Sequence, residues 1–181
     1  MGLLLAISNI YIPQFIRKRK LDMLFNATAE AFQVSPPSIR GLSYSDCLRL
    51  YARFTGEQTL KSIQQGDELK VRSRLLCNAR QIGQQFKADF NINTTEDVMR
   101  MGKLIYNLLK IDFQGESQGN IVIKRCFFSD YYTSDVCRVI SSLDEGLLTG
   151  LAGGGKLNFS QRITGGNECC RANLEAAGSP K

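Results

Sequence analysis

The chain contains no histidine and no tryptophan among its 181 residues. Without histidine, the chain cannot supply a Ser-His or Cys-His nucleophile couple, a histidine-ligated zinc ion or an imidazole proton shuttle. A general base must therefore be Asp, Glu, Lys, Tyr or a cysteine thiolate. Aromatic stacking depends on Phe and Tyr, because no indole ring is present.

The amino-terminal segment, MGLLLAISNIYIPQFIRKRK, lacks the features of a secretion signal or a membrane span. Its basic residues follow the apolar stretch, whereas a signal peptide has them first. Residues 3–16 are too few and too polar to cross a bilayer, which needs about 20 apolar residues. Residues 1–14 are therefore interpreted as a lipid-facing anchor or as a docking handle for a protein.

The composition is typical of a folded domain, with 43% hydrophobic and 22% charged residues. We expect one domain over residues 15–175 and a frayed tail over residues 176–181. The net charge is +6, but apart from residues 17–20 the Lys and Arg residues are spread along the chain, so no specific nucleic-acid partner is expected. The protein is predicted to be cytoplasmic with reduced thiols, and peripheral on a membrane if residues 1–20 bind lipid.

Apolar spacing and cap signals predict that the first 110 residues are mostly helical. SYSD and TTED each place a capping hydroxyl three residues before an acid, and Asp67 is also interpreted as a cap. The predicted helices cover residues 15–33 and begin at Ser43, after Asp67 and at Thr94.

Alternating and β-branched residues after Lys110 predict antiparallel strands. The first pair covers residues 110–115 and 120–127, helical spacing resumes over residues 130–151, and a second hairpin turns at residues 165–167. The fold class is therefore α+β, with four N-terminal helices packed on a C-terminal antiparallel sheet of two hairpins and an intervening helix.

Polar and thiol side chains recur in the C-terminal half. Cys126 ends a predicted strand, and Cys137 lies in the helix that follows. Asp144 is two helical turns after Cys137 on the same face, with Ser141 between them. A ligand entering at this point would meet a thiol, a hydroxyl and a carboxylate.

These residues carry a family resemblance that extends over about residues 43–175. The order of Cys126, Cys137, Asp144 and a Gly165-Gly166-Asn167 turn ending in Cys170 resembles the L-2-amino-thiazoline-4-carboxylic acid hydrolase-like family. That family is similar to the 4-vinyl-reductase-type ligand-binding domains and, in fold, to subunits of the TRAPP vesicle-tethering complexes. The resemblance implies a hydrolase-like or ligand-binding domain in which Cys170, and not Cys169, faces the site.

The cysteines allow three interpretations. Cys126, Cys137 and Cys170 could together hold zinc or an iron–sulfur cluster as a metal cofactor, although no CxxC is present. They could instead be small core side chains, or include a reactive thiolate whose pKa is lowered by a neighbouring Lys or Arg. Cys47 and Cys77 are predicted to lie in the helical core.

Three functions remain open. The first is a small-molecule-binding domain with a cysteine-centred pocket or metal site, in which Cys126, Ser141, Tyr131 and Tyr132 contact the ligand. The second is a hydrolase of a small cyclic or amide-like substrate, with Cys126 or Cys137 as nucleophile, or a metal-bound water, and Asp144 as general base. The third is a scaffold subunit of a larger assembly, either a homo-oligomer or a complex joined through residues 1–20.

Overall fold

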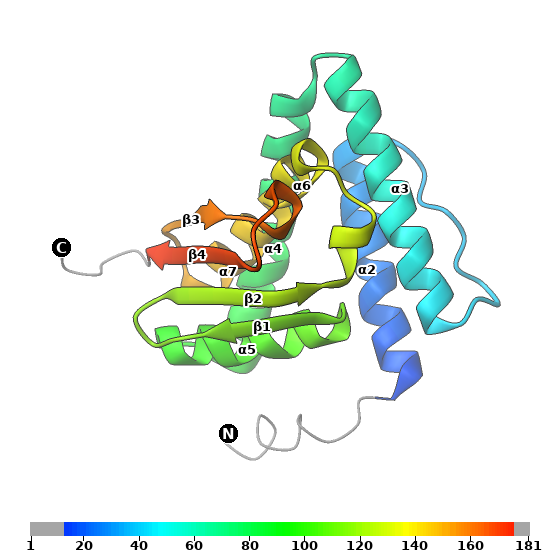
Figure 1. Ribbon diagram of the computed structural model, residues 1–181. Helices are drawn as coiled ribbons and strands as arrows, with labels where there is room; N and C mark the ends of the chain where they lie inside the picture. Colours follow the sequence, from blue (N-terminus) through cyan, green and yellow to red (C-terminus); the bar gives the residue numbers. More distant parts are fainter. Residues whose placement is uncertain (1–12, 176–181) are drawn as a thin grey trace.

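In the computed structural model, which describes residues 13–175, helices cover one face of an antiparallel sheet (Figure 1). The α+β class predicted from the sequence is confirmed, with the helices N-terminal and the sheet C-terminal. No helix within residues 13–175 is long and apolar enough to cross a membrane. The predicted anchor over residues 1–14 and the tail over residues 176–181 fall outside this range, apart from residues 13 and 14.

The helices after Ser43, Asp67 and Thr94 begin where the cap signals predicted, although Asp67 does not cap its helix through its side chain. Ser43 and Thr94 each accept a hydrogen bond from a backbone amide three residues later, and Thr94 forms a complete capping box with Asp97. Asp67 forms no capping bond and instead pairs with Lys70 at 2.8 Å. The helices are α2 (Gln14–Phe32), α3 (Tyr44–Gln64), α4 (Glu68–Phe90) and α5 (Thr95–Leu108).

The prediction that Cys77 lies in the core is wrong, whereas Cys47 is fully buried. The buried face of α4 is set by Val71, Leu75 and Ala79 at intervals of four residues. Cys77 lies two residues from Leu75, which is about 200° around a helix of 3.6 residues per turn. Its thiol therefore faces away from the core.

Cys77 is expected to react first with a thiol reagent in the folded protein. Cys77 is the exposed cysteine, whereas Cys126, Cys137 and Cys169 are half-buried and Cys47 and Cys170 are buried. Burial also raises the pKa of Cys126, Cys137 and Cys170, so their thiolate fractions are small at pH 7.5. Mass-resolved labelling should place the first adduct on Cys77, and Cys77→Ser should remove the fast phase. Faster labelling of Cys137 than of Cys77 would contradict the greater burial of the Cys137 thiol.

The four strands form one antiparallel sheet in the order β1-β2-β4-β3. Gly166 has a φ of 86° in the turn before β4, which is consistent with the predicted turn at residues 165–167, although a short 3₁₀ turn at Ile163–Gly165 precedes it. The strands are β1 (Ile111–Gly115), β2 (Asn120–Cys126), β3 (Lys156–Gln161) and β4 (Cys170–Glu175). Alternation along β2 and β4 turns Ile121, Ile123, Cys170, Ala172 and Leu174 toward the helices.

The single helix predicted over residues 130–151 is wrong, because the segment is divided. A 3₁₀ turn, η1 (Phe127–Asp130), leads to α6 (Ser134–Ile140), and α7 (Ser142–Ala152) follows. Thr133 caps α6 through its hydroxyl, and Ser141 joins the two helices. Cys137 and Asp144 consequently belong to different helices.

Helices α4 and α7 cross in very close contact. At Gly83, Gly146 and Gly150 a Cβ atom would overlap a backbone carbonyl oxygen of the facing helix. Glycines at these three positions let the two backbones approach without intervening side chains. This crossing fixes where the start of α7, and therefore Asp144, lies beneath the sheet.

Candidate functional site

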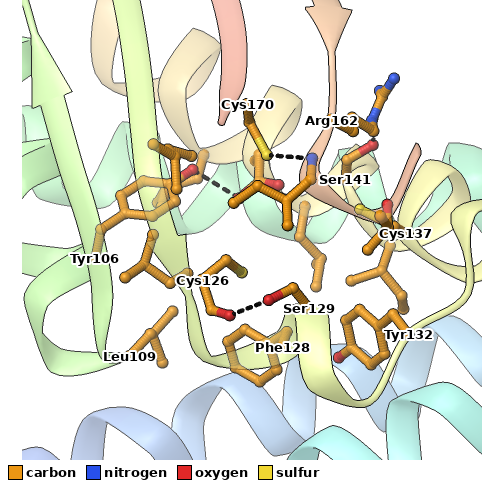
Figure 2. A pocket seen from close by; sticks show the side chains of 18 of the residues that line it. Tyr106, Leu109, Cys126, Phe128, Ser129, Tyr132, Cys137, Ser141, Arg162 and Cys170 are labelled. Carbon is orange, nitrogen blue, oxygen red and sulfur yellow. Dashed lines mark hydrogen bonds between the residues drawn. The ribbon is translucent and has the colours of Figure 1, made fainter. Parts of the chain in front are cut away.

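A cavity of about 110 Å³ lies between the inner face of the sheet and the helices (Figure 2). Its walls are mostly apolar and come from all four strands together with the two 3₁₀ turns and helices α2 to α7. Some of its polar groups lie where α6 meets α7 and where β3 leads into the 3₁₀ turn at Ile163–Gly165, and Ser129 of η1 lines another part of the wall. The apolar part of the lining includes Leu24, Ile105, Leu109, Ile123, Phe128, Ile140 and Leu147.

Three cysteines from separate elements line this cavity. Cys126 ends β2, Cys137 lies in α6 and Cys170 begins β4. Cys170 accepts a hydrogen bond from the backbone amide of Ile163 at 3.4 Å. The neighbouring Cys169 lies outside the lining.

The cysteines do not form a metal-binding arrangement. Within residues 13–175, no three Cys, Asp or Glu side chains are grouped so that they could hold a metal ion. The donor set of Cys126, Cys137 and Cys170 therefore does not fit the proposed zinc or iron–sulfur site. In the structure these thiols are part of a cavity wall.

The thiols in the cavity are held in the protonated form. Burial raises the pKa of Cys126 to about 12, and it also raises the pKa of Cys137 and of Cys170. The nearby Arg138 extends into solvent and pairs with Asp135 at 3.0 Å. The environment therefore favours neutral, weakly polar thiols over nucleophilic thiolates.

Asp144 is the acidic group of the cavity. The hydroxyl of Tyr106 donates a hydrogen bond to Asp144 Oδ1 at 2.6 Å, and the Tyr106 ring stacks on Phe113. Burial raises the pKa of Asp144 to about 6, an increase that the Tyr106 hydrogen bond and the charge of Arg162 partly oppose. A carboxyl group with this pKa can exchange a proton near neutral pH.

The other predicted ligand-contacting residues divide into two groups. Ser141 and Tyr132 line the cavity, and the Tyr132 hydroxyl lies 2.5 Å from the hydroxyl of Thr55. Tyr131 does not line it and packs on Phe127 with ring centroids 5.2 Å apart. Because η1 ends just before these two tyrosines, the adjacent side chains point in different directions.

Two residues of the site were not predicted from the sequence. Tyr106 lies 38 positions before its partner Asp144, and Arg162 follows β3 and donates to Ser141 Oγ at 3.2 Å. Neither belongs to a motif of fixed spacing. Only the buried position of Tyr106 on the inner side of α5 could have drawn attention to it.

A second apolar cavity, of about 220 Å³, lies between α2, α4 and α5. Its lining includes Ile16 and Lys20 at the start of α2 and Phe86 in α4. Five residues line both cavities, which shows that the two are adjacent: Leu24, Ile82, Ile105, Leu109 and Leu147.

No protein-family model matches the chain, and a search of curated proteins finds no matching relative.

Proposed function

We propose that the protein is a small-molecule-binding domain whose ligand occupies the cavity lined by Cys126, Cys137 and Cys170. The observation that carries this proposal is a mostly apolar cavity with a few polar groups in its wall, among them Ser141, Asp144 and Arg162. Ligand sites in proteins are commonly built in this way, with apolar walls for affinity and a few polar groups for orientation. The neutral thiols suit such a wall.

The size of the cavity limits the ligand. A cavity of roughly 150 Å³ lined by apolar side chains can hold benzene, and the cavity beside the cysteines measures about 110 Å³. A single ring or a short branched chain would therefore fit this cavity alone. A longer apolar ligand would also need the adjacent cavity near Lys20.

A hydrolase of a small cyclic or amide-like substrate is the second candidate. It is favoured by Asp144, whose pKa of about 6 suits a general base near neutral pH. Because burial raises the pKa of Cys137, this candidate relies on Asp144 activating a water molecule and not on a thiolate nucleophile. The resemblance to the thiazoline hydrolase-like family supports the same class of substrate.

Filling the cavity should abolish binding. Cys137→Phe places a ring where the ligand would lie, because the Cys137 side chain is part of the cavity wall. We expect toluene to raise the melting temperature of the wild-type protein, since a ligand that binds only the folded state stabilises it. The same addition should leave the melting temperature of Cys137→Phe unchanged.

The matched control is Cys77→Phe, which adds the same ring at an exposed position of α4. This variant should respond to toluene as the wild type does. An equal response from Cys137→Phe would mean that toluene binds elsewhere, and the proposed site would then be wrong. Circular dichroism of each variant checks that the fold is kept.

A further inference from the structure

A polar groove of about 200 Å³ opens beside the cysteine-lined cavity. It is formed by α4, the start of α7, β3 and the residue that follows β3. Three cationic side chains line it, from Arg72, Lys156 and Arg162, and Glu145 is its one carboxylate. The hydroxyls of Ser141 and Ser142 also line it, from side chains that are almost fully buried.

Two of the three cations of this groove donate hydrogen bonds to serine hydroxyls. Arg72 Nε donates to Ser142 Oγ at 3.3 Å, and Arg162 Nη2 donates to Ser141 Oγ at 3.2 Å. Within residues 13–175, none of the three cations forms an ion pair with a carboxylate. In the lining of the groove, three positive charges stand against the one negative charge of Glu145, and the Asp144 carboxyl, whose pKa the charge of Arg162 lowers, lies in the adjoining cavity.

Arg162 carries an additional unused donor. Its Nε atom is buried and has no hydrogen-bond partner among the described residues. A buried donor without a partner costs free energy, about 1–3 kcal/mol, unless a ligand or water accepts its hydrogen bond. The guanidinium also stacks over the ring of Phe159 at 4.4 Å, which helps to fix its plane.

The groove and the cavity meet at Arg162. Ser141, Phe159 and Arg162 line both of them. In Figure 2 the side chain of Arg162 extends away from the cysteines, so its guanidinium group lies on the side that faces away from the thiols. A ligand that spans this junction would have its apolar body beside the thiols and its polar end among the cations.

We propose that the groove binds the phosphate group of a small apolar phosphate monoester, whose apolar body enters the cysteine-lined cavity. This inference rests on the proposed function, because it assigns a ligand class to the same cavity. A phosphate monoester carries close to two negative charges at neutral pH and presents three acceptor oxygens. It therefore suits a groove lined by three cations better than a monocarboxylate, which carries a single negative charge. Guanidinium groups bind such oxyanions through paired N–H donors.

The test compares three probes that share one aromatic ring. Phenyl phosphate, benzoate and neutral benzyl alcohol are titrated into the full-length protein by calorimetry at pH 7.5. Phenyl phosphate is expected to bind at least tenfold more tightly than benzoate, and benzoate more tightly than benzyl alcohol. Its affinity should fall as salt is added, because part of the attraction is ionic.

Variants then locate the phosphate. Lys156→Gln removes an exposed cation of the groove and should weaken phenyl phosphate about tenfold, while leaving benzyl alcohol unchanged. Arg162→Lys keeps a positive charge but loses the planar donors, and it should also weaken phenyl phosphate. Lys103→Gln is the matched control, because it removes an exposed lysine of α5 that does not line the groove.

The outcomes separate this inference from the proposed function. If benzyl alcohol binds and phenyl phosphate binds no better, the phosphate assignment is wrong and the binding domain stands. If benzoate binds as tightly as phenyl phosphate, the preference for a dianion is wrong. Equal losses of phenyl phosphate affinity in Lys103→Gln and Lys156→Gln would show that the attraction comes from the overall positive charge, and the groove would then not be the phosphate site. If no probe binds, the proposed function fails as well.

Discussion

Gly146→Ala is expected to lower the free energy of unfolding by about 3 kcal/mol or more, at the upper end of what overpacking costs. The added Cβ would overlap the carbonyl oxygen of Leu76 and would lie 2.9 Å from the Cβ of Ala79. Neither group can rotate away, because one is backbone and the other is a methyl attached directly to it. Helices α4 and α7 must therefore move apart, which also moves Asp144. Urea unfolding at pH 7 measures the loss.

Gly56→Ala is the matched control. Gly56 is also a buried helical glycine, but a Cβ there would have its nearest contact at 3.7 Å, with the ring of Tyr132. Alanine fits this space and favours the helix, so the variant should be as stable as the wild type or more stable by up to about 1 kcal/mol. Wild-type stability in Gly146→Ala would contradict the close crossing of α4 and α7.

Asp144→Asn is expected to stabilise the protein at pH 8 by up to about 3 kcal/mol, the equivalent of two pKa units. The pKa of Asp144 is raised to about 6 from an ordinary value of 3.8 because the group is buried, so the folded state favours the protonated carboxyl. Its stabilising contribution is therefore complete below pH 3.8 and is lost as the pH rises through 6. Asparagine is neutral throughout and can still accept the bond from Tyr106.

Only the difference between the wild-type and Asp144→Asn stability curves isolates this group. Other acids act in the opposite direction: hydrogen bonding to the hydroxyl of Thr94 lowers the pKa of Asp97, for example. The difference curve should be flat above pH 7 and should change mainly between pH 4 and 7. Tyr106→Phe removes the bond that lowers the pKa of Asp144, so it should move this window to higher pH. A less stable Asp144→Asn at pH 8 would contradict the burial of the charge.

The same substitution distinguishes the two candidate functions. If the protein is a hydrolase, turnover of a thiazoline-type substrate by Asp144→Asn should fall by roughly 10²–10⁴-fold with folding intact, the usual cost of losing a general base. If it is a binding domain, the wild type should show no turnover. Asp144→Asn should then change ligand affinity only to the extent that the ligand contacts the carboxyl group. If Asp144→Asn is more stable but has lost turnover, Asp144 lowers the stability of the wild type and contributes to catalysis.

The helices were predicted well because their signals are local. A capping hydroxyl and its amide lie three residues apart, as at Ser43 and Thr94, and an apolar stripe repeats within two turns. The errors arose where local spacing was extended too far. Cys77 was assigned to a face on which it does not lie, and a single helix was continued through the junction at Ser141.

The sequence by itself determined that no histidine chemistry can occur in this chain, that the fold is α+β, and that thiols and an acid recur in the C-terminal half. Only the tertiary structure decided which of those groups share a cavity. Tyr106 contacts Asp144 across 38 residues, and Arg162 meets Ser141 across 21, through contacts that no local pattern encodes. The physical reason is that these contacts depend on how closely α4 and α7 cross and how they lie beneath the sheet, a geometry set by packing of segments distant in the sequence.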